Sequence, residues 1–364
     1  MRRLEKLTVK NFKSIRDQSL ALTNLNIFIG GNGAGKSNLV QAFRFLREIV
    51  TQNLANYTAM KGGADNLLYF GRKLSPEMEL FLEFGEKNTS NSYRVKLRGT
   101  DQDSLIIAEE TAYYHDKVRY KQKPFDLPIA SGSQESRLKG EKHICARQVS
   151  ADLESYRVYH FHDTSDTAAV KGTVDIDDNR VLRPQAENLA AFLYWMQERK
   201  PDTYANIEDT IRQIAPFFDG FRLAPQRLND TKIKLEWKEK GSDSYFNASS
   251  LSDGTLRFIC LTTLLLQPSL PSVVLLDEPE LGLHPAAIRL LADLLSSAAT
   301  RAQVVVSTQS VTLVNQYDQT TVWAVDRVRG ESVFRHLGTD DMTHWLDHYA
   351  LGELWEKNIL GARP

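Results

Sequence analysis

Apolar and polar residues alternate through much of the first third of the chain. Residues 4–15 and 20–29 both follow a period of two, which predicts an early hairpin leading into the first central strand. The same period returns over residues 77–123, where segments separated by turn residues predict an antiparallel outer sheet. Residues 125–141 have no period and are expected to form a loop.

A helical period begins directly after residue 36. The apolar positions of residues 37–50 recur at steps of three and four, which predicts a helix there. Continuous apolar runs at 272–276 and 302–307 are typical of buried strands, and residues 320–334 have the pattern of a hairpin. Such runs alternating with helices indicate an α/β fold with a mostly parallel sheet covered on both faces. Further helices are predicted over 188–198, 204–214, 254–266 and 284–299, and a strand pair near 232–237 and 245–247.

These elements predict one composite domain, residues 1–364, built from two lobes. Lobe I spans residues 1–124, an insertion with helices spans 125–250, and lobe II spans 251–335. A tail follows at 336–364. Its aromatic and apolar side chains are expected to cap the core or to dock a partner; they are Trp345, Tyr349, Leu354 and Trp355.

Composition narrows the class of protein. The chain has 364 residues, 42% hydrophobic and 25% charged, with a formal net charge of -1, so any nucleic acid or membrane would have to bind a local patch. Two cysteines are too few for a disulfide framework or a zinc site, and the apolar run at 258–266 is too short to cross a membrane. We therefore expect a cytoplasmic protein in a reducing compartment.

Residues 30–37 read GGNGAGKS and join an apolar run to the first predicted helix. The pattern is that of a phosphate-binding loop, in which glycines let backbone N–H groups converge on an anion at a helix N-terminus. Lys36 would contact the β- and γ-phosphates, and the Ser37 hydroxyl would bind Mg²⁺. The alternative is a glycine-rich turn without a ligand. The residues predicted to bind the nucleotide are Gly30, Asn32, Gly33, Ala34, Gly35, Lys36, Ser37 and Asn38.

A second motif, VVLLDEP at 273–279, ends an apolar strand with two carboxylates. The carboxyl ends of strands are where α/β sheets bind ligands. Asp277 is predicted to bind Mg²⁺, and Glu278 to orient or deprotonate the water that attacks the γ-phosphate. A strand that ends in two acids for no functional reason is the alternative.

A third motif, LSDGT at 251–255, precedes that strand and opens a predicted helix. Ser252 is a favoured N-cap residue, and Gly254 would let backbone N–H groups approach a ligand closely. Taken alone, the motif would indicate only a capped helix.

The order of these motifs resembles that of the ABC-type ATPases. The opening LTVKNFKSIRD and the segment GGNGAGKSN are similar to the RecF, SMC and OLD-type branch, over residues 1–95 and 180–335. The resemblance implies a two-lobed P-loop head in which two copies pair around ATP, so that Ser252 and Gly254 of one copy contact nucleotide held by the other. It also implies that Lys13 and Ser14 contact nucleotide.

Two positions depart from the family pattern. Asp253 stands where transporter-type signatures have glycine, and Arg257 is a candidate for a compensating cation. Gln309 follows the apolar strand at 302–307 where the family usually has a histidine that touches the γ-phosphate. A glutamine amide can position water but cannot become cationic. We therefore expect Gln309 to support slow, switch-like hydrolysis without a histidine-type titration.

Two weaker signals concern DNA and metals. Residues 117–123 alternate basic with other residues, so a strand there would present four cations to DNA phosphates, unless it is simply a solvated sheet face. His160 and His162 could face a metal, although a third ligand is not evident and ordinary structural histidines are the alternative. The acidic run at 175–178 reads as a solvated turn. The four cations are Lys117, Arg119, Lys121 and Lys123.

Together these observations predict an ATPase that needs ATP and Mg²⁺, dimerises on ATP, hydrolyses it slowly and acts on DNA or on a partner effector. Genome maintenance or antiviral defence is the role that the resemblance suggests. The alternative is a non-catalytic, nucleotide-gated scaffold that holds a separate effector, and a membrane transporter subunit is the third reading. The coiled coil and nuclease domain found in parts of the family have no counterpart here, so a nuclease activity would come from another protein.

Overall fold

The structure is a computed structural model that describes residues 2–86, 88–120, 123–339, 345 and 348–362. The chain divides into two compact units whose segments are interleaved in the sequence. The lobe boundaries expected near residues 124, 250 and 335 remain a prediction. The first unit comprises Met1–Val158, Pro271–Leu275 and Gln303–Pro364, and the second comprises Tyr159–Leu270 and Leu276–Ala302.

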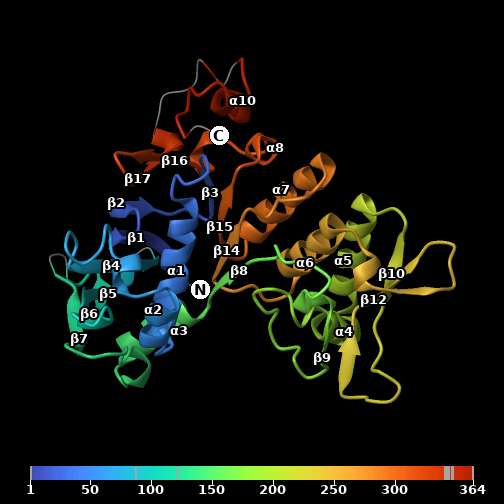
Figure 1. Cartoon of the computed structure of the whole chain (residues 1–364), viewed down its shortest axis with the longest axis horizontal. Coiled ribbons are helices and arrows are strands. Elements are labelled where there is room, and N and C mark those ends of the chain that lie inside the picture. Colours follow the sequence, from blue (N-terminus) through green and yellow to red (C-terminus); the bar gives the residue numbers. More distant parts are fainter. Residues whose placement is uncertain (1, 87, 121–122, 340–344, 346–347, 363–364) are drawn as a thin grey trace. The chain divides into compact units, whose positions relative to one another are not determined.

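An antiparallel sheet in the first unit has the strand order β2-β1-β4-β5-β6-β7 (Figure 1). The expected N-terminal hairpin is confirmed, but it closes at Lys13, whose φ is 51°. Residues 20–29 therefore do not form one strand: Leu20 and Ala21 end β2, and β3 belongs to another sheet. The strands are β1 (Arg3–Phe12), β2 (Ile15–Ala21), β4 (Glu77–Glu86), β5 (Thr89–Gly99), β6 (Leu105–Asp116) and β7 (Phe125–Ala130).

The prediction of a strand over residues 117–123 is wrong for those of its residues that the structure describes. Residues 117–119 form a turn, because the Asp116 carboxylate accepts hydrogen bonds from the backbone N–H groups of Val118 and Arg119, at 3.1 and 2.9 Å. Lys121 lies outside the described residues. The loop expected over 125–141 is also wrong in part, since β7 pairs with β6 as an edge strand that tolerates Pro128.

A second sheet has the order β17-β16-β3-β15-β14-β8. β3 runs parallel to both β15 and β16, and β16 pairs antiparallel with β17, which confirms the predicted C-terminal hairpin. The last residues of β14 and β8 already belong to the second unit. The strands are β3 (Leu25–Ile29), β8 (Tyr156–Tyr159), β14 (Val273–Asp277), β15 (Gln303–Thr308), β16 (Val322–Val328) and β17 (Glu331–His336).

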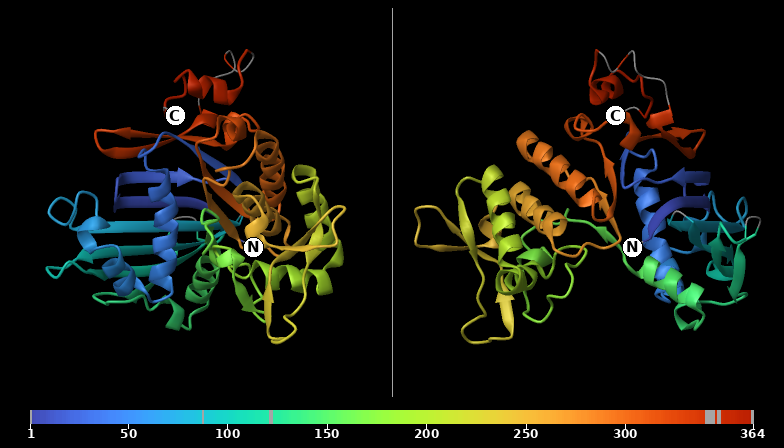
Figure 2. Two further views of the ribbon diagram at one scale, coloured as in Figure 1. Left: turned by 45° about the vertical axis from the view of Figure 1, so that its right-hand side comes forward. Right: turned by 180° about the vertical axis from the view of Figure 1, so that it is seen from behind.

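Helix α1 (Lys36–Val50) packs against both sheets of the first unit and is the predicted helix (Figure 2). Its buried face includes Phe43 and Phe45, and Phe45 stacks on Phe12 of β1 with ring centroids 5.5 Å apart. α2 (Leu54–Met60) and α3 (Ile144–Glu154) extend this core. Near the C-terminus, α8 (Val311–Val314) and α10 (Leu351–Glu356) follow; Leu354 and Trp355 are fully buried, as the capping role predicts, whereas Trp345 is 43% exposed.

The second unit is mainly helical. It contains α4 (Leu189–Arg199), α5 (Pro201–Ile214), α6 (Asp253–Leu266) and α7 (Pro285–Ala299), at the positions the sequence predicts. Its small sheets are β10-β12-β13 and β11-β9, formed by β9 (Thr173–Asp175), β10 (Phe218–Arg222), β11 (Lys232–Lys234), β12 (Glu236–Glu239) and β13 (Tyr245–Asn247). Among the described residues of both units, no helix has the length and apolar content needed to span a bilayer.

Candidate functional site

The glycine loop between β3 and α1 depends on glycine for steric reasons. Gly33 and Gly35 have φ of 78° and 117°, a backbone region that other residues rarely adopt. A Cβ on Gly30 would overlap the backbone carbonyl of Val325, because β16 lies directly beside β3. The packing of β16 against Gly30 and the left-handed glycines therefore both fix the shape of the loop that precedes α1.

Lys36 is the first residue of α1 and is only 4% exposed. Its ammonium Nζ donates to the carbonyl oxygen of Gly30 at 2.5 Å and to that of Gly31 at 3.3 Å. The charge is thus held inside the loop, next to the positive end of the helix. The Ser37 hydroxyl group belongs to an exposed residue at the same helix end.

A chain of short hydrogen bonds supports the loop from behind. Asn38 Nδ2 donates to Ser14 Oγ at 2.6 Å, and the hydroxyl groups of Ser14 and Ser332 lie 2.6 Å apart. Ser332 Oγ also donates to the carbonyl of Ala34 at 2.6 Å. Ser14 is 7% exposed and Ser332 is fully buried, so both act first as supports for the loop. Ser332 was not predicted as a site residue, because a serine in a hairpin strand carries no motif.

Two cations lie beside the loop. Lys13, in the turn between β1 and β2, donates through Nζ to Gln41 Oε1 at 2.5 Å. Burial, and to a smaller extent the charge of Lys61, lowers the pKa of Lys13 below its usual range. Arg327 Nη1 donates to the carbonyl of Gly33 at 3.2 Å. Arg327 was not predicted, because one arginine in a hairpin gives no signal of its own.

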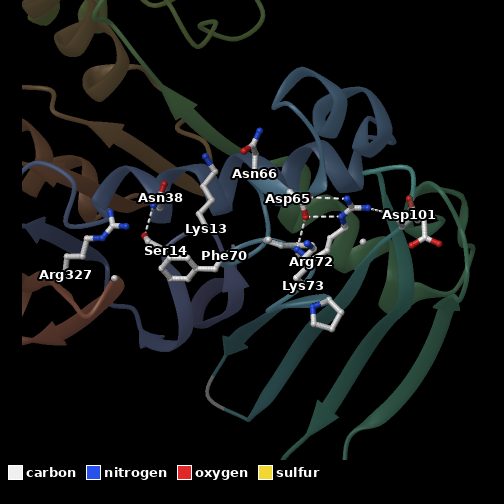
Figure 3. A pocket seen from close by; sticks show the side chains of 16 residues that line it. Lys13, Ser14, Asn38, Asp65, Asn66, Phe70, Arg72, Lys73, Asp101 and Arg327 are labelled. Carbon is white, nitrogen blue, oxygen red and sulfur yellow. Dashed lines mark hydrogen bonds and ion pairs between the residues drawn. The ribbon is translucent and has the colours of Figure 1, made fainter.

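A pocket of about 1010 Å³ opens next to the first turn of α1, and we call it the α1 pocket. Lys13, Ser14, Asn38 and Arg327 line one part of it, and an aromatic ring, Phe70, stands beside them (Figure 3). Three of the residues predicted to contact nucleotide, Lys13, Ser14 and Asn38, thus share this cavity.

Gln309 lies at the same sheet edge as the glycine loop. β15 pairs in parallel with β3, and the register sets Thr308 opposite Ile29. Gln309 and Gly30 are the next residues of the two strands. The chemistry of this edge is an uncharged amide next to a buried lysine and backbone N–H groups, which suits a phosphate ester and a water molecule.

The two predicted carboxylates lie at the end of β14 and in the loop that follows it, in the second unit. Asp277 ends β14, and Glu278 follows with a φ of 45°, a left-handed conformation that is uncommon for a side chain of this size. Both residues are half-buried. His162 Nε2 lies 2.6 Å from the backbone carbonyl oxygen of Asp277, so this histidine supports the loop. Among the described residues, no cluster of three or more His, Cys, Asp or Glu could hold a metal ion.

Arg257, the cation that the sequence suggested as compensation for Asp253, is held by backbone carbonyls. Its side chain is 5% exposed and donates to three backbone carbonyls: Phe161 through Nε at 2.8 Å, His162 through Nη2 at 3.1 Å, and Leu281 through Nη1. Burial lowers the pKa of Arg257, and the nearby Asp253 charge opposes that effect. Each of its three side-chain nitrogens therefore donates to a carbonyl of the second unit.

The third motif caps α6 as its residues predict. Ser252 is exposed, and its Oγ accepts a hydrogen bond from the N–H of Thr255 at 3.2 Å. A Cβ on Gly254 would lie 2.5 Å from the carbonyl oxygen of Gly282, so the helix start and the loop after Glu278 are in close contact. His284 caps α7, because its Nδ1 accepts a hydrogen bond from the N–H of Ala286 at 3.2 Å.

The basic patch is only partly present. Lys117 and Arg119 are exposed on the turn after β6 rather than on one face of a strand. Lys117 Nζ lies 3.4 Å from Glu83 Oε1, and Lys123 is exposed. The acidic run, expected as a solvated turn, is one only in part: Asp175 ends β9 and pairs with Lys232 at 2.8 Å, and the turn follows with Asp177 exposed.

The structure brings the glycine loop, Lys13, Ser14 and Gln309 together within the first unit, whereas Asp277, Glu278, Ser252 and Gly254 belong to the second. A glycine loop between a parallel strand and a helix, in a fold with one mostly parallel and one antiparallel sheet, defines a P-loop NTPase of the ABC type. The chain belongs to the family described as "AAA domain, putative AbiEii toxin, Type IV TA system", whose model matches residues 25–315. Members of this class are typically ATPases.

Distant relatives confirm the resemblance to RecF and SMC proteins. The DNA replication and repair protein RecF of Renibacterium salmoninarum is 23% identical over 312 residues, which cover 79% of this chain and 76% of that protein. The RecF of Paenarthrobacter aurescens is 24% identical over 231 residues, which cover 59% of this chain and 57% of that protein.

Two solved structures share the fold. An SMC head bound to the C-terminal winged-helix domain of ScpA has a TM-score of 0.58 and 16% identity, and covers 91% of this chain and 96% of that chain. An SMC head with an extended coiled coil from Pyrococcus furiosus, bound to the C-terminal domain of ScpA, has a TM-score of 0.57 and 15% identity, covering 95% and 99%. The predicted head fold, with a mostly parallel sheet and an antiparallel sheet, is therefore confirmed.

Proposed function

We propose that this protein is a cytoplasmic ATPase that binds ATP at the glycine loop, hydrolyses it slowly and pairs with a second copy around two nucleotides. The observation that carries the proposal is the parallel register of β3 and β15, which sets Thr308 opposite Ile29. It supports placing Gln309 and Lys36 around the same triphosphate.

Each residue has a distinct role in this proposal. Lys36 neutralises charge on the β- and γ-phosphates as the bond to the leaving group lengthens. Glu278 accepts a proton from the attacking water, and Gln309 orients that water by accepting or donating through its amide. Because the amide stays neutral, the transition state receives less electrostatic stabilisation than a cationic histidine would provide, and turnover is slow.

The donor set fits Mg²⁺. The metal prefers oxygen ligands and retains several waters, and the chain offers the exposed Ser37 hydroxyl and the half-buried Asp277 carboxylate. Ser37 and Asp277 would hold the ion together with phosphate oxygens, and the ion would supply charge neutralisation at those oxygens. Asp277 is supported through its own carbonyl by His162, which holds the end of β14 in place.

The exposed start of α6 supports pairing between copies. Ser252 is exposed, and the N-terminus of α6 carries the positive end of its helix dipole, which favours an anion brought by a partner. A second copy that presents its bound triphosphate to Ser252 and Gly254 would complete the site. ATP then holds the dimer together, and hydrolysis releases it.

Two variants test the ATPase. We expect Lys36→Ala to abolish binding of a fluorescent ATP analogue, and Glu278→Gln to retain binding while hydrolysis falls at least about 100-fold. Lys139→Ala, which removes an exposed lysine from a short helical turn, is the matched control and should change neither property. ATP binding that is absent in the wild type, or that survives Lys36→Ala, would refute the proposal.

The dimer has its own test. The Glu278→Gln protein with ATP should sediment as a dimer, and adding Ser252→Arg should leave it monomeric while nucleotide binding is retained. If the double variant still dimerises on ATP, α6 does not form the interface and the pairing proposal is wrong.

The substrate of the cycle is DNA or a partner protein. DNA is favoured by the RecF relatives, named for DNA replication and repair, and a partner by the SMC heads solved with ScpA domains. Charge reversal at Lys117 and Arg119 should weaken DNA binding and flatten its dependence on salt concentration. Unchanged binding would exclude this turn as the DNA contact.

The neutral Gln309 also supports a second candidate, a nucleotide-gated scaffold in which hydrolysis is incidental and a separate effector is held by the ATP-bound dimer. Glu278→Gln separates the two candidates in cells. A protein that needs its ATPase cycle loses function in this variant, whereas a scaffold keeps its effector bound and remains active.

A further inference from the structure

Phe70 lies on the surface of the α1 pocket in an unusual conformation. Its side chain is 61% exposed, and its φ is 51°, in a region that a bulky residue seldom occupies. Gly71 follows with a φ of 79°. Exposing an aromatic ring and straining its backbone both cost free energy, and such features persist where the surrounding structure fixes them.

Neighbouring residues hold the ring in place. Tyr69 is 6% exposed and meets Phe70 edge to face, with ring centroids 4.7 Å apart. The backbone N–H of Tyr69 donates to the carbonyl of Asn11 at 3.0 Å. A Cβ on Gly330, whose φ is 87°, would lie 3.0 Å from Phe70 Cζ, so the hairpin turn between β16 and β17 leaves just enough room for the ring.

The ring shares its pocket with residues beside the glycine loop. Lys13, Ser14 and Asn38 line the α1 pocket next to the first turn of α1, and Arg327, which contacts Gly33, lines it as well. Figure 3 shows Phe70 beside Ser14, between these residues and Arg72 with Lys73. The pocket therefore combines one aromatic ring with a cationic and polar lining, and it begins where a bound triphosphate would end.

We propose that Phe70 stacks on the base of a purine nucleoside triphosphate whose phosphates occupy the glycine loop. This inference rests on the proposed nucleotide function and adds the residue that recognises the base. A base gains binding affinity by stacking on an aromatic ring or a guanidinium group. This gain does not require hydrogen bonds to the edge of the base. Purines present a larger stacking area than pyrimidines, so the ring favours ATP and GTP over CTP and UTP.

The polar lining argues against an apolar partner at this ring. Lys13, Arg72, Lys73 and Arg327 surround the pocket, and Arg72 Nε donates to Asp65 Oδ1 at 2.9 Å. An apolar protein segment would have to desolvate these charges, whereas a ribose and a phosphate chain would satisfy them.

The test compares ATP with inorganic tripolyphosphate, which has the phosphates but no base. Phe70→Ala should weaken ATP binding between about 5-fold and 100-fold and leave tripolyphosphate binding unchanged. Phe70→Tyr and Phe70→Trp should retain ATP affinity, and the Trp variant's fluorescence should respond to ATP but not to tripolyphosphate. CTP binding should be weaker than ATP binding and less sensitive to Phe70→Ala.

Leu74→Ala is the matched control, because Leu74 is 64% exposed on the same segment and lines a different pocket. It should leave both affinities unchanged. Wild-type ATP affinity in Phe70→Ala, with binding still lost in Lys36→Ala, would overturn the stacking role and leave the ATPase proposal intact. Equal losses for ATP and tripolyphosphate would show that Phe70 only shapes the loop. If the wild type binds neither ligand, the nucleotide function itself is wrong.

Discussion

The Arg257 guanidinium donates through Nε to the backbone carbonyl of Phe161 at 2.8 Å, inside the second unit. The same side chain reaches His162 and Leu281 through its other nitrogens. α6, the segment that leaves β8 and the loop after Glu278 are therefore joined by one buried cation. We expect a change at the Ser252 end of α6 to affect the loop that carries Glu278, because Arg257 links the two.

Replacing Arg257 should slow ATP hydrolysis by more than the loss of folded protein alone would explain. Arg257→Met leaves three carbonyls without their donor, at a cost of about 1–3 kcal/mol for each that stays buried. We expect a lower melting temperature and at least about a tenfold loss of kcat, with KM for ATP unchanged because the glycine loop is untouched. Arg257→Lys should restore part of both properties.

The control is Arg301→Met. Arg301 donates to the carbonyls of Gln267 and Leu265 at the far end of the same helix, at 2.9 and 2.6 Å. It should lower the melting temperature without changing kcat per folded molecule. Equal effects of the two variants on kcat would mean that Arg257 contributes only to stability.

Gly254 should not tolerate a methyl group. A Cβ there would lie 2.5 Å from the carbonyl oxygen of Gly282, closer than van der Waals contact allows, so α6 or the loop must shift. We expect Gly254→Ala to lose ATP-dependent dimerisation and hydrolysis while the first unit still binds ATP. Gly140→Ala has no atom within 4 Å of the new Cβ and should behave as wild type. Sedimentation and ATPase assays test this prediction. Normal ATP-dependent dimerisation of Gly254→Ala would show that the close contact between Gly254 and Gly282 is not needed for pairing.

Gln309 should make hydrolysis insensitive to pH near neutrality. A glutamine amide does not titrate, so the rate should be flat between about pH 5.5 and 7.5, where a histidine would change charge. In Gln309→His we expect a faster rate and a new titration near about pH 6.5. Gln309→Ala should be slower than the wild type and equally flat. A wild-type profile with a histidine-type step would show that another group controls the reaction.

The sequence predicted the parts of this molecule that local chemistry determines. Glycines at 33 and 35 and the apolar run before them specify the loop, because other residues rarely adopt that backbone conformation. The sequence pattern predicted α1 and α7 to within one residue at each end. The site residues that were missed act over long sequence separations: Ser332, on β17, supports Ala34 from 298 residues away. The carbonyl partners of Arg257, at residues 161, 162 and 281, could not be predicted for the same reason, since they have no local signature.

Both cysteines should be unreactive in the folded protein, and their ionisation should weaken the fold at high pH. Burial raises the pKa of Cys145 to about 11 and that of Cys260 to about 12, each from an ordinary value of 9.0. At about pH 8 the thiols stay protonated, so labelling with a thiol reagent should be slow until the protein unfolds. Above pH 9.0 the unfolded chain releases these protons and the folded chain does not, so stability present below that pH is lost as the pH rises toward 11 and 12. Each thiol contributes a slope of at most about 1.4 kcal/mol per pH unit. Urea unfolding of Cys145→Ser and Cys260→Ser should show a shallower decline than the wild type, and rapid labelling of the native protein at about pH 8 would show that the thiols are accessible.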